Sequence, residues 1–113
     1  MKERTVKLRG LNLEIWRKDF EVDGDPKMTV NNAMDDLEKL GEGWRIPDYR
    51  EMLIISHLVD LGILAEPSSR EDYWTSFADP DYGGNHGVFS FDDRNFYSRF
   101  NNERLYVRPV RTI

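Results

Sequence analysis

The feature that most constrains this chain is a change in hydrophobic period along its length. Residues 5–9 and 11–16 alternate apolar and polar side chains, which is typical of strands with one buried face. Between residues 29 and 61 the apolar side chains recur at helical spacing, and beyond residue 73 short aromatic and β-branched segments return. A chain with early helices and a late antiparallel sheet is expected to form an α+β fold.

Two amphipathic helices are predicted in the middle of the chain. The first begins after an N-cap at Thr29 and ends at Gly41, where a left-handed residue can terminate a helix. The second begins after Asp48, which can form a capping box with Glu51, and it ends at Gly62. The apolar face predicted for the first helix comprises Val30, Ala33, Met34, Leu37 and Leu40.

Four late strands are predicted at 73–77, 87–91, 96–100 and 105–110. Residues 92–95 close a hairpin that places Phe91 opposite Phe96. Phe89 then lies opposite Ser98. The predicted buried face of this hairpin holds Phe89, Phe91, Phe96 and Phe100, and its outward face holds Ser90, Tyr97 and Arg99.

Length and composition narrow the class of protein. A chain of 113 residues predicts one domain spanning residues 1–113, and with no cysteine it has no disulfide or thiolate metal site. No apolar run is long enough to cross a bilayer, and no signal peptide is visible, so membrane insertion is not expected. A cytoplasmic location is the default expectation, with export open if the chain is processed or belongs to a particle.

The net charge of -5 argues against nucleic acid as a partner, because binding to phosphates needs a basic field. The charge is uneven: residues 1–20 carry six basic and three acidic side chains, residues 21–81 five and fifteen, and residues 82–113 five and three. If the two ends pair in one sheet, they would form a basic patch for an anionic partner. The favoured alternative is that these are ordinary solvated strand residues.

Catalytic and metal-binding candidates are few. His57 lies within the second predicted helix, where a partly buried structural imidazole is expected, and His86 lies in a Gly-rich loop. Asp79 and Asp81 precede His86 and leave open a metal-dependent enzyme as one alternative. Because the alternating ligand pattern of an EF-hand is absent, no calcium site, metal or cofactor is predicted.

The remaining candidate site is a recognition surface formed by the Gly-rich loop and the outward face of the hairpin. Tyrosine and arginine supply contact area and directional donors at modest entropic cost. The same composition is also that of an ordinary polar strand face. The predicted ligand-binding residues are Tyr82, Asn85, His86, Arg94, Tyr97 and Arg99.

Four short phrases resemble a known family when they are taken in order: residues 29–33 (TVNNA), 43–47 (GWRIP), 73–76 (YWTS) and 107–111 (VRPVR). Together they are similar to the Lcl C-terminal domain family, named for the end domain of a collagen-like bacterial adhesin. The resemblance implies a C-type-lectin-like fold, with paired N- and C-terminal strands, two helices flanking a sheet, and a loop region that presents ligands. Pro109 stands where many members have cysteine, so their disulfide is absent here.

The residues of these four phrases also have structural explanations, which we favour. Trp44 and Trp74 are expected to be core or half-buried anchors, and Arg45 to pair with Asp48 or cap a loop. Arg108 and Arg111 are expected to lie along strand surfaces.

The function expected from the resemblance and from the failed catalytic patterns is non-enzymatic binding of a glycan or protein. Two alternatives stay open: a structural or assembly subunit of a surface or phage particle, and the metal-dependent enzyme described above. The oligomeric state is not predicted.

Overall fold

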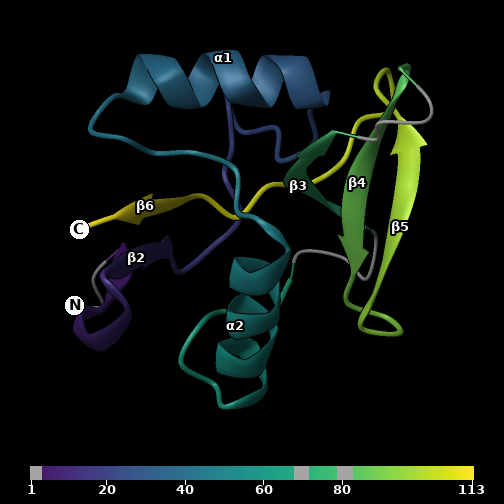
Figure 1. Cartoon of the computed structure of the whole chain (residues 1–113). Helices are drawn as coiled ribbons and strands as arrows, with labels where there is room; N and C mark the ends of the chain where they lie inside the picture. Colours follow the sequence, from purple (N-terminus) through teal and green to yellow (C-terminus); the bar gives the residue numbers. More distant parts are fainter. Residues whose placement is uncertain (1–3, 68–71, 79–82) are drawn as a thin grey trace.

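The computed structural model describes residues 4–67, 72–78 and 83–113. In chain order its elements are β1 (Thr5–Leu8), a short 3-10 turn (Arg9–Leu11), β2 (Leu13–Trp16), α1 (Val30–Leu40), α2 (Tyr49–Asp60), β3 (Asp72–Ala78), β4 (Asn85–Ser90), β5 (Asn95–Phe100) and β6 (Val110–Thr112). Helices and strands therefore follow one another as the hydrophobic period predicts, and the α+β class is confirmed (Figure 1).

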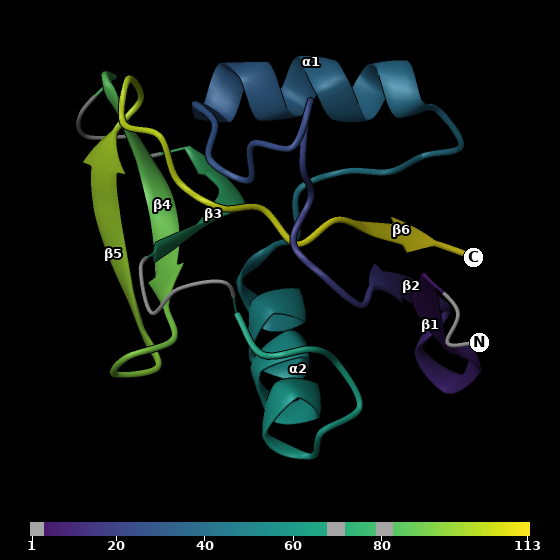
Figure 2. The ribbon, with the colours of Figure 1, turned by 180° about the vertical axis from the view of Figure 1, so that it is seen from behind.

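Six strands form two antiparallel sheets of three, in the orders β1-β2-β6 and β3-β4-β5. In the first sheet Leu13 pairs with Thr112 and Ile15 with Val110, so strands from the two ends of the chain lie side by side, as expected. The predicted strand 105–110 is wrong in extent, because β6 begins only at Val110. Figures 1 and 2 show the preceding segment crossing the centre of the molecule between the two sheets.

This segment, residues 105–109, is called the central segment below. It is held by several different neighbours instead of one continuous strand partner. Leu105 pairs with Met28 in an isolated bridge, and the N–H of Phe20 donates to the carbonyl of Val107 at 2.9 Å. Tyr106 forms a parallel bridge with Tyr73 of β3. Because its partners come from both halves of the chain, this segment joins the two sheets.

Both helices begin where their caps predict. The Thr29 hydroxyl accepts from the N–H of Asn32 at 3.2 Å, and the capping box between Asp48 and Glu51 is formed in both directions. The apolar face predicted for α1 is too wide, since Met34 and Leu40 are exposed. The part of the helix that packs on the core consists of Val30, Ala33 and Leu37.

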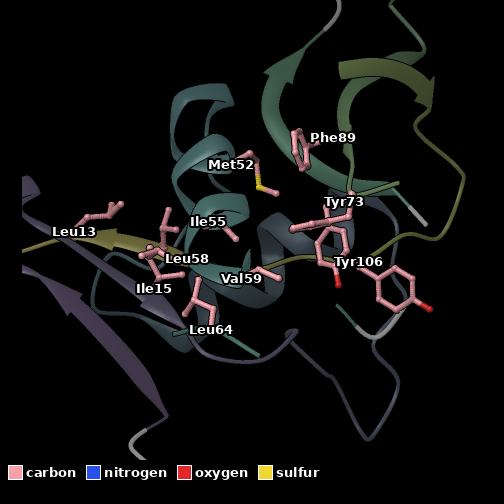
Figure 3. Close-up of a cluster of buried hydrophobic side chains, with 12 residues drawn as sticks. Leu13, Ile15, Met52, Ile55, Leu58, Val59, Leu64, Tyr73, Phe89 and Tyr106 are labelled. Atoms are coloured by element: carbon pink, nitrogen blue, oxygen red, sulfur yellow. The ribbon is translucent and has the colours of Figure 1, made fainter. Parts of the chain in front are cut away.

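Two buried apolar clusters form the core, and β4 lies between them. Phe89 belongs to the cluster that packs α2 against β3 and the central segment (Figure 3), whereas Val88 belongs to the cluster under α1. Trp74 is fully buried in the second cluster, and its indole N–H donates to the carbonyl of Met28 at 2.9 Å, which confirms it as a core residue. Trp44 is half-buried beside the same cluster.

The hairpin of β4 and β5 forms in a register that differs from the prediction. Phe96 pairs with Phe89, not with Phe91, and Arg94 in the turn adopts a φ of 59°. Phe91 lies in the turn and is nonetheless buried. The assignment of Phe100 to the core is wrong, because β5 is the edge strand and Phe100 at its end is 66% exposed.

Arg108 does not lie along a strand surface as expected. Its guanidinium is fully buried and forms an ion pair with Asp19, with an Nη2 to Oδ1 distance of 2.8 Å. It also donates to the carbonyls of Arg17 and Ala65, and the hydroxyl of Tyr73 donates to the second oxygen of Asp19 at 2.6 Å. A buried charge is tolerated only with such a full set of partners, so this network fixes how the central segment meets its neighbours.

The other arginines of the four phrases, Arg45 and Arg111, are also paired. Arg45 forms a bidentate pair with Glu51, at 2.6 and 2.7 Å, and not with Asp48. Arg111 pairs with Glu14 at 2.7 Å and Glu42 at 3.0 Å. The carboxylates of Glu14 and Glu42 thus neutralise Arg111 where the two ends of the chain meet.

Candidate functional site

The β4–β5 hairpin carries most of the residues predicted to bind a ligand. Asn85 and His86 begin β4, and Tyr97 and Arg99 lie on β5, with His86 directly paired with Arg99. Arg94 lies in the turn at the opposite end of the hairpin. Tyr82, like Asp79 and Asp81, lies outside the described residues. The structure therefore brings part of the predicted set together and separates Arg94 from it.

His86 is not in a loop, as the Gly-rich sequence suggested, but is buried in β4. Its Nε2 lies 2.7 Å from the carbonyl oxygen of Thr75, and because a carbonyl only accepts, Nε2 must carry the proton. Burial lowers the pKa of His86 and thereby favours the neutral ring. This imidazole links β3 to β4 instead of facing a ligand.

The second histidine is also placed differently from the prediction. His57 is exposed on α2, on the side that turns away from the core, between the exposed Leu53 and Leu61 one helical turn to either side. Among the described residues, no group of three or more His, Asp and Glu side chains is arranged to hold a metal ion.

Arg94 attaches the hairpin to α2. Its guanidinium donates to the hydroxyl of Ser56 at 2.5 Å and to Asp60 at 2.8 Å, and it lies 5.3 Å from the centre of the Phe91 ring. These contacts position the turn, so the prediction that Arg94 is free to bind a ligand is not supported by its surroundings.

Arg99 and Tyr97 lie on the face of β5 that was predicted to point outward. Arg99 lines a polar groove of about 570 Å³, where its Nε lies 2.7 Å from Asp72 and its Nη1 lies 3.7 Å from Glu103. The hydroxyl of Tyr97 donates to Asp93, which raises the pKa of that phenol. Both side chains are about half exposed, but their polar ends are already paired within the protein.

The opposite face of the same hairpin carries an aromatic surface that the sequence did not predict. We call it the aromatic patch and define it as Tyr49, Phe77, Phe96 and Phe100. The Tyr49 ring centre lies 4.2 Å from that of Phe96 and 5.1 Å from that of Phe77. Phe100 continues the face of Phe96 along β5, since side chains two residues apart share a face.

Gly87 explains how Tyr49 of α2 reaches this sheet. A Cβ atom at Gly87 would lie 2.5 Å from the Tyr49 hydroxyl oxygen, so a larger residue there would displace this hydroxyl from its place over β4. A lone glycine inside a strand is the one sequence signal that could have pointed to this close approach. The aromatic patch is thus a rigid surface built from α2, β3 and β5.

No protein-family model matches the chain, and no curated protein matches it at a significant level. Within the described residues, no helix is both long and apolar enough to cross a membrane.

Proposed function

We propose that this chain is a non-catalytic binding domain whose aromatic patch recognises a glycan. The observation that carries the proposal is the exposure of large aromatic rings on one rigid face, with Phe77 45% and Phe100 66% exposed. Soluble domains seldom leave several large aromatic side chains in water on one sheet unless the surface has a partner. Flat aromatic faces can stack on the apolar faces of sugar rings.

Polar groups beside the aromatic patch would give such binding its direction. Asn85 pairs with Phe100 across the hairpin, so its amide is on the same face as the exposed ring. An amide offers both donors and an acceptor for sugar hydroxyls. The combination of apolar contact area and a few polar groups is typical of small-molecule and saccharide sites.

We further propose membership of the Lcl C-terminal domain family and a C-type-lectin-like fold. Three features support this proposal: the order of the elements, the antiparallel pairing of β2 with β6, and the two helices packed beside the sheets. Each of them agrees with what the resemblance of the four phrases implies.

The test is a glycan array, run with and without calcium, followed by titration of the best ligand. The Phe77→Ala/Phe100→Ala double variant is expected to bind about fivefold to 150-fold more weakly, because each of the two ring contacts contributes about 0.5–1.5 kcal/mol. The matched control is Tyr97→Ala/Arg99→Ala on the opposite face, which should retain wild-type affinity. If only the control variant lost binding, the site would lie in the polar groove beside Arg99. If no glycan on the array bound the protein, the proposal of glycan binding would be contradicted.

A second candidate function is that of an assembly subunit, because Phe100 lies at the end of the edge strand β5. Apolar side chains on an edge strand favour association with another chain. Sedimentation equilibrium over a range of concentrations distinguishes this function, which requires oligomers that the Phe100→Ala variant weakens. The metal-dependent enzyme is the least supported proposal, since the imidazole of His86 is already bonded to Thr75.

A further inference from the structure

Another concave site lies where the end of α1 meets the loop before α2 and the strand β3. This groove has a volume of about 490 Å³. Its apolar wall is formed by Met34, Leu37, Trp44 and Ile46. The backbone of the loop is held in place, since the N–H of Ser76 donates to the carbonyl of Pro47 at 2.8 Å. The groove is therefore a preformed hollow between fixed elements.

The polar rim of the groove is acidic. Glu38 on α1 lines it, and among the described residues its carboxylate has no hydrogen bond or ion pair. Asp48 lines the other side, where one of its oxygens accepts from the N–H of Glu51 at 2.8 Å and the other has no partner in the described part of the chain. Two carboxylates thus border the apolar wall; in the described part of the chain neither forms an ion pair, although Arg45 lies close enough to Asp48 to attract it.

The basic side chains near the groove are neutralised by other carboxylates. Arg45 also lines it, but its guanidinium is held by both oxygens of Glu51. Arg111 lies over the Trp44 ring, 4.7 Å from its centre, and pairs with Glu14 and Glu42. Neither arginine leaves an uncompensated positive charge to oppose a cation.

The partial charges at the helix ends also favour a cation in this groove. The C-terminus of α1 is at the groove, because Gly41, which caps the helix, is among the lining residues. The carbonyls at a helix C-terminus carry a partial negative charge that favours cations. The N-terminus of α2 would favour anions, but the carboxylates of Asp48 and Glu51 already occupy it.

We propose that this groove binds an organic cation, meaning an ammonium or guanidinium group carried on an apolar body. The apolar part packs on Met34, Leu37 and Trp44, and the charged group lies between Glu38 and Asp48. No residue of the aromatic patch is among those that line the groove, and the proposal does not depend on glycan binding.

The experiment follows backbone amide shifts by NMR in the full chain during titration with three probes of one shape: phenethylammonium, phenethyl alcohol and hydrocinnamate. The cation is expected to shift the amides of residues 41–46 and Ser76, the neutral alcohol to bind more weakly, and the anion not to bind. Added salt should weaken the binding of the cation, because rim charges are screened. Equal binding of the three probes, or no shift with the cation, would overturn the proposal.

The variant that tests the two carboxylates is Glu38→Gln/Asp48→Asn, in which asparagine keeps the N-cap of α2. Affinity for phenethylammonium is expected to fall about fivefold to tenfold. The matched control is Asp35→Asn, which removes an exposed carboxylate of α1 that does not line the groove. Wild-type affinity in the double variant, or an equal loss in the control, would contradict the assignment of the cation to this rim.

Discussion

The centre of the molecule and the hairpin at its rim use the same kinds of side chain in opposite ways. At the centre, Trp74 and Arg108 are fully buried and each of their polar groups has a partner. On the hairpin, Phe100 is exposed, and Arg99 is about half exposed in a polar groove. Residue type alone therefore does not tell whether an aromatic or an arginine supports the fold or faces solvent.

The difference follows from how many elements cover each region. The central segment is contacted by both halves of the chain, whereas β5 has a single neighbouring strand in its sheet. A side chain at the centre is desolvated and costs free energy unless it is packed or paired. A side chain on the edge strand remains available for a ligand.

The largest expected effect separates the two aromatic residues of this comparison. Trp74→Ala should lower the free energy of unfolding by about 3–5 kcal/mol, because it removes a fully buried ring and its hydrogen bond to Met28. Phe100→Ala should change it by less than about 0.5 kcal/mol, because that ring is mostly in water. Urea denaturation of the two variants measures both values. Similar costs for the two substitutions would show that the rim is packed as tightly as the centre.

A somewhat smaller effect is expected for the two arginines. Arg108→Met leaves the Asp19 carboxylate buried without its cation and should cost about 3 kcal/mol of stability. Arg99→Met should cost less than about 1 kcal/mol, since its partner Asp72 borders a groove open to solvent.

A double-mutant cycle gives the control for Arg108. In Arg108→Met/Asp19→Asn no uncompensated charge remains, so the double variant should be less destabilised than the sum of the two single variants. Additive losses in urea denaturation would mean that the ion pair does not couple the central segment to Asp19.

Local signals in the sequence account for what was predicted correctly. The capping box of α2 and the N-cap of α1 join residues three positions apart, so a short stretch of sequence is enough to predict where each helix begins. The pairing of the chain ends was expected from the resemblance to a family, and it was confirmed in position but not in strand length.

The misplaced residues depend on contacts between distant parts of the chain. Arg108 and Asp19 are 89 positions apart, and no local pattern predicts which carboxylate a buried arginine will meet. The turn of the hairpin is held against α2, because Arg94 bonds to Ser56 and Asp60, which are 38 and 34 positions away in the chain. Alternation along β5 predicts which side chains share a face, but it does not predict where the cover provided by α2 ends. The aromatic patch was missed for this reason.

The smallest expected effect concerns the two histidines, one buried in β4 and one exposed on α2. Burial lowers the pKa of His86, so the unfolded chain, with a pKa near 6.5, takes up a proton more readily than the folded protein as the pH falls. The contribution of a neutral His86 is therefore fully present above about pH 6.5 and decreases as the pH falls toward its lower folded value. In His86→Gln, the loss of stability measured by urea denaturation between about pH 7 and pH 5.5 should be smaller than in the wild type. His57→Gln is the matched control, because it removes the other imidazole, which is exposed on α2. If His57→Gln flattened the profile while His86→Gln did not, the assignment of the buried, neutral role to His86 would be wrong.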